Sequence, residues 1–223
     1  MIGTSHIAKQ SIDEIKTAIE NYNPDIIAVE LDTERAHALL SKTKRKTSAR
    51  SALKFGLTGY LFALLGQHAQ QKLGRAVGVE PGEEMKTALE LAKEKKKDIA
   101  LIDQPIHITL TNISQGFGWK EKGRFLADIV KGVIQPRKQA KMMGFDFDLN
   151  KVPENELIEK MMTYLHTRYP SLHKAIIDDR NKYMVKKIIN LIRTNPEKKI
   201  LVIVGAGHIK GMKELLLKVE IVR

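Results

Sequence analysis

Short apolar runs recur along this chain, and polar or glycine residues bound each of them. Residues 25–31 read DIIAVEL, residues 98–103 read DIALID, and residues 199–205 read KILVIVG. Strands that are covered on both faces are nearly continuous in apolar residues, so these runs predict strands of a parallel sheet. Ile2 is the end of a first strand, and VEIV at 219–222 is a candidate fifth.

The segments between these runs have helical periodicity. In residues 11–22, Ile15 and Ile19 share one face, and the capping-box spacing of Ser11 and Glu14 predicts that the helix opens there. Two further helices are predicted at TERAHALL (33–40) and GEEMKTALELAKEKKK (82–97). Alternation of strands with helices indicates an α/β domain.

The middle of the chain has a mainly helical pattern from residue 105 to residue 197. Residues 51–73 form another helical stretch within the early α/β part. We therefore expect one α/β domain over residues 1–223, with a parallel-rich central sheet flanked by helices. Helical insertions are expected at about 45–78 and 105–197.

Four polar residues follow the predicted strands, namely His6, Glu30, Asp103 and His208. Both histidines stand in a Gly-x-x-His motif, GTSH near the start of the chain and GAGH near its end. Ligand sites of open parallel sheets form beyond the carboxyl ends of the strands, so we expect these four side chains to converge.

Two imidazoles and a carboxylate are a ligand set for a divalent metal such as Zn²⁺, Mn²⁺, Co²⁺ or Fe²⁺. His6, His208 and Glu30 are the candidate ligands, and a metal there would acidify a bound water. Without metal, Glu30 is a candidate general base or the partner that orients a histidine. The structural alternative is that Glu30 forms a salt bridge with Arg35, while Asp103 caps a helix or a turn.

The stretch DDRNKYM at 178–184 places Arg180 and Asn181 within an amphipathic helix. Arg180 is a candidate clamp for a carboxylate or a developing oxyanion. The alternative is a surface ion pair with Asp178 or Asp179. The remaining histidines are interpreted as surface or packing residues; these are His37, His68, His107, His166 and His173.

The composition of the chain excludes some kinds of site and some partners. The chain has no cysteine, which excludes disulfides, a thiol nucleophile and a thiolate metal site. No leader pattern opens the chain, and no run reaches the about 18 apolar residues of a membrane span, which favours a cytoplasmic location. The formal net charge is +12, but the basic residues are mostly dispersed and aromatic residues make up only 5%. We therefore do not expect nucleic acid as a partner.

Several segments, taken in order, resemble the TraB/PrgY pheromone-shutdown family. They are GTSHIAKQS, NPDIIAVELDTERAHAL, GVEPGEEMKTALELA, IALIDQPIHITL, DDRNKYMVKKI and VIVGAGHIKGM. The resemblance spans nearly the whole chain and extends to a superfamily with GumN proteins, Tiki metalloproteases, erythromycin esterase and haem-binding ChaN proteins. It implies an erythromycin esterase/ChaN-like fold.

The resemblance also implies roles for particular residues. The paired Gly-x-x-His histidines of the superfamily correspond to His6 and His208, its acidic residue to Glu30, and its Arg-Asn motif to Arg180 and Asn181. Tiki proteins are metal-dependent peptidases, and TraB relatives are proposed to inactivate peptide pheromones. The implied function is therefore a metal-dependent hydrolase of peptides or related amides and esters, with Mn, Co, Zn or Fe as cofactor.

One position departs from the family pattern. The family often shows Asp-Arg where this chain has Asp103-Gln104, so a charge that could contact substrate is missing. The competing hypothesis is a non-catalytic signalling module whose cleft binds a peptide or a tetrapyrrole. Relatives often carry membrane helices after the last strand, so membrane association stays open.

A basic and apolar stretch at 42–66 has three interpretations. Its lysines and arginines precede an apolar run that is too short to span a bilayer. Such a segment can lie on an anionic membrane surface, pack in a homodimer interface, or cover the cleft as a lid. We favour packing or dimerisation, because its glycines resemble a close helix-contact face.

Overall fold

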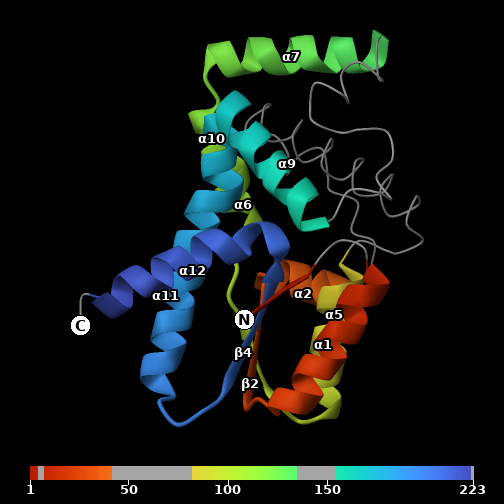
Figure 1. Cartoon of the computed structure of the whole chain (residues 1–223), viewed down its shortest axis with the longest axis vertical. Coiled ribbons are helices and arrows are strands. Elements are labelled where there is room, and N and C mark those ends of the chain that lie inside the picture. The colour runs from red at the N-terminus through yellow and green to blue at the C-terminus, as the bar shows by residue number, and fades with distance from the viewer. Residues whose placement is uncertain (5–7, 42–81, 135–153, 222–223) are drawn as a thin grey trace.

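The computed structural model describes residues 1–4, 8–41, 82–134 and 154–221 (Figure 1). Its four strands form one parallel sheet in the order β1-β4-β2-β3. The strands are β1 (Ile2–Thr4), β2 (Ile26–Val29), β3 (Asp98–Leu101) and β4 (Ile200–Gly205). The four predicted strands and the α/β class are therefore confirmed.

The register of the sheet brings the carboxyl ends of all four strands to one edge. Thr4 of β1 pairs with Gly205 of β4. Val29 of β2 pairs with Ile203 of β4 on one side and with Leu101 of β3 on the other. The residues that follow these strands are therefore neighbours, although they are far apart in sequence.

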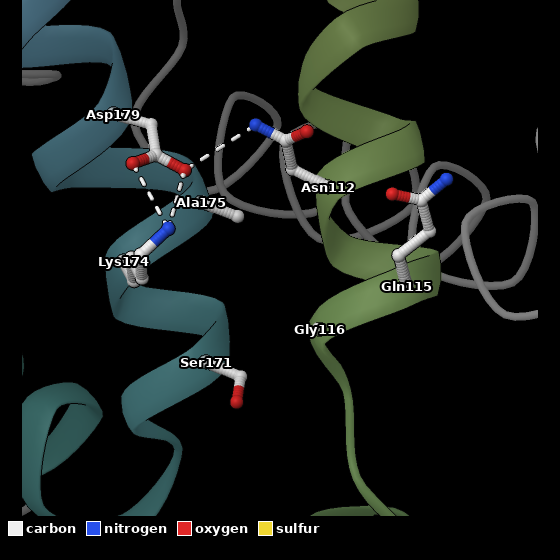
Figure 2. A pocket seen from close by; sticks show the side chains of 7 residues that line it. All are labelled: Asn112, Gln115, Gly116, Ser171, Lys174, Ala175 and Asp179. Carbon is white, nitrogen blue, oxygen red and sulfur yellow. Dashed lines mark hydrogen bonds and ion pairs between the residues drawn. The ribbon is translucent and has the colours of Figure 1, made fainter.

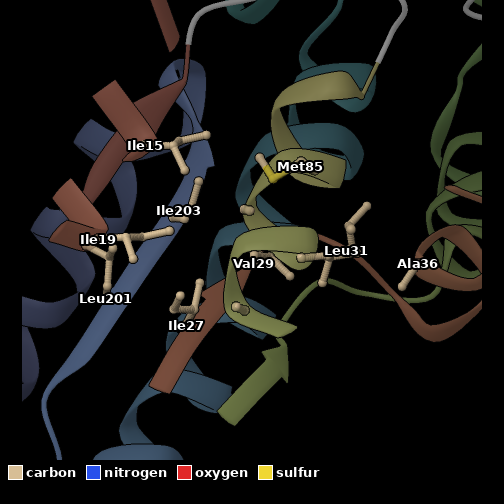
Figure 3. Packing of buried hydrophobic residues seen from close by; sticks show 12 residues of the cluster. Ile15, Ile19, Ile27, Val29, Leu31, Ala36, Met85, Leu201 and Ile203 are labelled. Carbon is tan, nitrogen blue, oxygen red and sulfur yellow. The ribbon is translucent and has the colours of Figure 1, made fainter. Parts of the chain in front are cut away.

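Helices cover both faces of the sheet, which explains why the central strands β2 and β4 are apolar, whereas the edge strand β3 begins with two exposed residues, Asp98 and Ile99. The helices are α1 (Ala8–Tyr22), α2 (Thr33–Leu40), α5 (Glu83–Glu94), α6 (Ile106–Gly116), α7 (Trp119–Ile134), α9 (Glu154–Arg168), α10 (Pro170–His173), α11 (Asp179–Thr194) and α12 (Ala206–Ile221), with a π-helix, η1, at Lys174–Asp178. On one face, Ile27 and Val29 of β2 pack with Ile15 of α1 and Leu89 of α5 (Figure 3). On the other face, Ala28 of β2 packs with residues of α11 and α12.

Two local predictions are wrong. Helix α1 begins at Ala8, so Ser11 is a buried residue inside the helix and does not cap it. VEIV is not a strand, because α12 continues through Ile221. No glycine or proline follows Gly211 to end that helix, and Met212 and Leu216, four residues apart, pack on the same side against the sheet.

Some predictions lie outside the described residues. They are the helical stretch at 51–73, the basic and apolar stretch at 42–66, and the whole insertion at about 45–78. In the described part of the chain, no helix is both long enough and apolar enough to cross a membrane.

The middle of the chain forms a helical layer beyond the carboxyl edge of the sheet (Figure 1). Helices α6, α7, α9 and α10 share an apolar cluster that includes Phe117 and Tyr169. An ion pair between α7 and α9 lies beside this apolar cluster. Asp128 of α7 accepts hydrogen bonds from Arg168 at 2.5 and 2.6 Å and from the Tyr169 hydroxyl at 2.5 Å. The hydrogen bonds from Arg168, together with that from Tyr169, outweigh the effect of burial and lower the pKa of Asp128.

We expect Asp128→Asn to lower the free energy of unfolding by about 1–2 kcal/mol at pH 7, because a hydrogen-bonded charge is lost. A carboxyl with a lowered folded pKa stabilises the protein above its unfolded pKa of about 3.9. That contribution disappears as the pH falls through the folded pKa, so the difference between variant and wild type should shrink below about pH 4. Urea unfolding at a series of pH values measures it.

Glu156→Gln is the matched control. Glu156 forms an exposed pair with Lys160 at 2.7 Å on α9, and such pairs contribute at most about 0.5 kcal/mol. Equal losses for the two variants at pH 7 would contradict the role assigned to Asp128.

Candidate functional site

Glu30 follows β2 at the carboxyl edge of the sheet, and its side chain is 11% exposed. Its Oε2 accepts a hydrogen bond of 2.6 Å from the Gly205 N–H at the end of β4. Its Oε1 accepts a hydrogen bond from Arg180 and lies 3.3 Å from Nε2 of His208. The carboxylate therefore joins three elements that are distant in sequence.

These contacts keep Glu30 ionised. Burial by itself would raise the pKa of this carboxyl. The hydrogen bond and charge of His208, the charge of Arg180 and the Gly205 N–H act against burial and bring the pKa well below its usual range. A group with so low a pKa is an anion at neutral pH and a weak base.

Arg180, in the first turn of α11, bridges two carboxylates. Besides the bond to Glu30, its Nε donates to Asp103 Oδ1 at 3.0 Å and its Nη2 donates to Asp103 Oδ2 at 2.6 Å. Nη1 donates to the Ile176 carbonyl at 3.2 Å. Burial lowers the pKa of Arg180, but the charges of Glu30 and Asp103 and the hydrogen bonds that Arg180 donates to both raise it above its ordinary value.

The surface ion pair proposed as the alternative for Arg180 is not formed. Asp178 lies 3.3 Å from Nδ1 of His173, and Asp179 accepts from Lys174 at 3.2 Å. The reason is the π-helix η1, which directly precedes α11 and supplies the Ile176 carbonyl. A π turn rotates the residues that follow it relative to a regular helix, and such turns are frequent at functional sites.

His208 lies in the first turn of α12 and is 5% exposed. Its Nδ1 is 2.6 Å from Oδ1 of Asn181, the residue after Arg180. With that amide oxygen as acceptor, Nδ1 carries a proton, and Nε2 on the other side of the ring faces Glu30. When Nε2 is also protonated it donates to the carboxylate, and when it is not, its lone pair is available to a ligand. Asn181 is thus the residue that orients the imidazole.

A glycine makes room for Asn181. A Cβ on Gly211 would stand 2.5 Å from Nδ2 of Asn181, closer than such contacts allow. The third residue of the helix, His208, and the sixth, Gly211, are therefore coupled through the same amide. No pattern in the sequence singles out Gly211.

A second layer of charge lies behind Asp103. Asp32 caps α2, accepting from the Arg35 N–H at 2.8 Å and from its Nε at 2.9 Å. Arg35 also donates to Asp103. The structural salt bridge considered as the alternative for Glu30 is formed, but its partner is Arg180 and not Arg35, because Arg35 is held by the two aspartates. Burial raises the pKa of Asp32, but the Arg35 N–H and charge lower it further, so the net shift is downward.

Gln104, which stands where the family often has arginine, directs its side chain at α6 and not at Asp103. Its side chain is buried and donates to Thr109 Oγ1 at 3.0 Å, at the start of α6. Its backbone N–H donates to Asp103 Oδ1 at 2.7 Å. The carboxylate of Asp103 instead receives two guanidinium groups, from Arg35 and Arg180.

The structure thus brings Glu30, Asp103 and His208 together around Arg180. His6 lies outside the described residues; the strand before it ends at Thr4, which pairs with Gly205. Within the described ranges, no group of three or more His, Asp or Glu side chains is arranged to hold a metal ion. His208 and Glu30 offer two donors there, and the metal-ligand roles stay predictions.

Other candidate residues lie apart from this cluster. His37, His107 and His166 are exposed, and the ring of His173 contacts that of His166 at 4.9 Å. His68 lies outside the described residues.

A polar pocket of about 310 Å³ lies between α6 and the α10–η1 segment (Figure 2). It is lined by Asn112, Gln115, Gly116, Ser171, Lys174, Ala175 and Asp179. Asp179 accepts from Lys174 at 3.2 Å and from Asn112 at 3.3 Å, so the charges that line the pocket pair with each other. None of the residues bonded to Glu30 lines it.

The comparisons with known proteins cover nearly the whole chain. The model of the TraB/PrgY/gumN family matches residues 1–220. An uncharacterized protein of Methanocaldococcus jannaschii is 31% identical over 99% of this chain and 53% of its own length. The TraB domain-containing protein of Homo sapiens is 24% identical over 96% of this chain and 61% of its own length. The chain therefore spans about half to three-fifths of the length of these relatives.

We expect Gly211→Ala to lower the melting temperature, because the new methyl group would displace Asn181 from His208. The matched control is Gly207→Ala in the same helix, whose Cβ would meet Met162 at an ordinary 3.5 Å. Alanine favours a helix by up to about 1 kcal/mol over glycine, so the control should be unchanged or more stable. Thermal unfolding followed by circular dichroism measures both, and a stabilised Gly211→Ala variant would refute the packing constraint.

Proposed function

The chain belongs to the TraB/PrgY/gumN family, and from the geometry of its site we propose that it is a metal-dependent hydrolase of peptides or related amides and esters. One observation carries the proposal. A buried, ionised carboxylate, Glu30, faces Nε2 of a histidine whose other ring nitrogen is held by an amide oxygen. Histidines that ligate metals usually have this second hydrogen bond on the opposite nitrogen.

The distance between the two donor atoms fits a shared ion. Nε2 of His208 and Oε1 of Glu30 are 3.3 Å apart. Two atoms that each lie about 2.0 Å from one ion at a tetrahedral angle are about 3.3 Å apart. In the proposal, His6 supplies the third ligand, and the ion is Zn²⁺, Mn²⁺, Co²⁺ or Fe²⁺.

The charge balance of the cluster also favours a cation. Three carboxylates, those of Glu30, Asp32 and Asp103, face two guanidinium groups, those of Arg35 and Arg180. With the neutral imidazole that a metal ligand requires, the described part of the cluster keeps one negative charge in excess, whereas without metal a protonated His208 would balance it. Buried charge is costly unless it is compensated, so an added cation would stabilise this arrangement.

A divalent ion bound here would lower the pKa of a bound water and polarise a substrate carbonyl. The residues of the chain would divide the remaining tasks. A general base works best with a pKa near the working pH, and Glu30 is held far below it. We therefore assign Glu30 to metal binding and not to proton abstraction.

Arg180 and Asp103 act in this proposal as positioning residues. Four hydrogen bonds from the Arg180 guanidinium are already directed at protein oxygens. A guanidinium group has five N–H donors, so at most one is left for a substrate carboxylate or oxyanion. Arg180 therefore mainly fixes Glu30, and Asp103 in turn fixes the plane of Arg180.

The second candidate is a non-catalytic module that binds a peptide or a tetrapyrrole. The observation that favours it is that both carboxylate oxygens of Glu30 already accept hydrogen bonds, one from the Gly205 N–H and one from Arg180. In that case the cluster would be structural, and the chain would bind its ligand without turning it over.

Metal content separates the two candidates. We expect the wild type, incubated with Mn²⁺, Co²⁺ or Zn²⁺ and then dialysed, to retain about one ion per chain. The His6→Ala/His208→Ala double variant should retain none and should lose peptidase activity. His107→Ala, which alters an exposed histidine, is the control for loss of a surface imidazole. Equal metal content in the wild type and the double variant, measured by elemental analysis, would refute the metal site.

Asn181 offers a finer measurement. We expect Asn181→Ala to weaken metal binding by about 10–100-fold, because the imidazole loses the partner that fixes its tautomer. Asn181→Asp keeps an oxygen that accepts from Nδ1 and should restore most of the affinity. Competition with a chelator dye measures both variants, and circular dichroism reports whether they fold. If both variants bind metal as the wild type does, Asn181 does not orient the ligand.

A further inference from the structure

Helix α7 presents an apolar face to solvent. The α7 face consists of Trp119, Leu126, Ile129, Val130 and Ile134, whose exposed fractions run from 39% to 86%. Trp119, Leu126, Val130 and Ile134 are separated by seven, four and four residues, which places them on one side of the helix. A continuous exposed apolar patch on a folded protein marks an interaction site.

The opposite side of α7 fixes this orientation. The ring of Phe125 lies 5.9 Å from those of Phe117 and Tyr169, in edge-on contacts. Asp128 is bound by Arg168, and Glu121 accepts from the Ser171 N–H at 3.0 Å. The helix cannot turn the α7 face inward without breaking these contacts. Figure 1 shows α7 at the end of the molecule farthest from the sheet.

The exposed charges of α7 itself all have one sign. Lys120, Arg124 and Lys131 are exposed, and Lys122 places its ammonium 4.8 Å from the centre of the Trp119 ring. The two acids of the helix, Glu121 and Asp128, are the inward residues already described. The exposed surface of α7 therefore combines an apolar stripe with cationic flanks and a terminal tryptophan.

We propose that the α7 face docks on an anionic lipid membrane surface. A helix with an apolar face, basic flanks and an aromatic residue lies in the membrane interface, and anionic headgroups attract its cations. A symmetric dimer through this face is disfavoured, because it would bring the cations of two α7 helices together. Nucleic acid is disfavoured because the centre of the face is aliphatic. This proposal is independent of the proposed hydrolase activity.

The chain contains a natural reporter at this surface. Trp119 is its only tryptophan and is 86% exposed. We expect vesicles of equal parts phosphatidylglycerol and phosphatidylcholine to shift its emission to the blue and to sediment the protein. Phosphatidylcholine vesicles should do neither at physiological salt, and added NaCl should weaken the anionic binding.

Two variants test the α7 face itself. Leu126→Ser/Val130→Ser should lower vesicle binding by at least about tenfold, since two buried apolar side chains are lost. Lys120→Gln/Lys131→Gln should lower it by a similar factor, because each basic residue near an anionic surface contributes to binding. The matched controls are Ile192→Ser/Leu217→Ser and Lys182→Gln/Lys186→Gln, which alter exposed residues on α11 and α12 and should bind as the wild type does.

Several outcomes would overturn the proposal. Unchanged Trp119 emission with anionic vesicles would contradict it. Equal vesicle binding by the α7 variants and their controls would also contradict it, because the membrane contact would then lie elsewhere, for example in residues 42–66. A dimer in solution that Leu126→Ser/Val130→Ser dissociates would assign the face to a second copy of the chain. Oligonucleotide binding that competes with the vesicles and is lost in Lys120→Gln/Lys131→Gln would assign it to nucleic acid.

Discussion

The guanidinium group of Arg180 is the contact on which the rest of the site depends. It binds Glu30, which follows β2, and Asp103, which follows β3, and it belongs to α11 on one face of the sheet. Two carboxylates this deeply buried would repel one another and resist ionisation without a cation between them. Because Arg180 neutralises both, β2 and β3 can end side by side in acidic residues, and α11 is held against the carboxyl edge of the sheet.

The shape of the backbone decides what else reaches Glu30. The N–H of Gly205 donates to this carboxylate at 2.6 Å, and a side chain at that position would crowd it, since a Cβ would lie 3.3 Å from Oε2. The helix that follows brings His208 to the other oxygen. The π turn before α11 sets the phase at which Arg180 and Asn181 face the sheet. The Gly-x-x-His spacing is thus explained by one glycine that admits the carboxylate and one helical turn that returns the ring to it.

The apolar runs predict the strands, because strands covered on both faces, as β2 and β4 are, consist almost entirely of apolar residues. The parallel order then placed Glu30, Asp103 and His208 at one edge, and this was predictable from their positions after the strands. The hydrogen-bond partners of these three residues were not predictable. Arg180 and Glu30 are 150 residues apart, and sequence spacing offered the nearer acids Asp178 and Asp179 as an equal alternative. In the structure those two acids pair with His173 and Lys174, respectively. The π turn and the fit of Gly211 against Asn181 leave no pattern in a single sequence, since both depend on packing between distant helices.

One helical path connects the two surfaces on which the proposals rest. Tyr169, which binds Asp128 of α7, precedes α10, and α10, η1 and α11 then follow without a break to Arg180. The path from Pro170 to Arg180 is continuous helix, and it fixes the position of one end relative to the other. The α7 face and the Glu30 cluster are therefore held at a fixed separation by a helical path that the Tyr169–Asp128 hydrogen bond anchors at one end and the ion pairs of Arg180 anchor at the other. If α7 lies on a membrane, the carboxyl edge of the sheet is held at a set distance above it, with helices α6, α9 and α10 between the two.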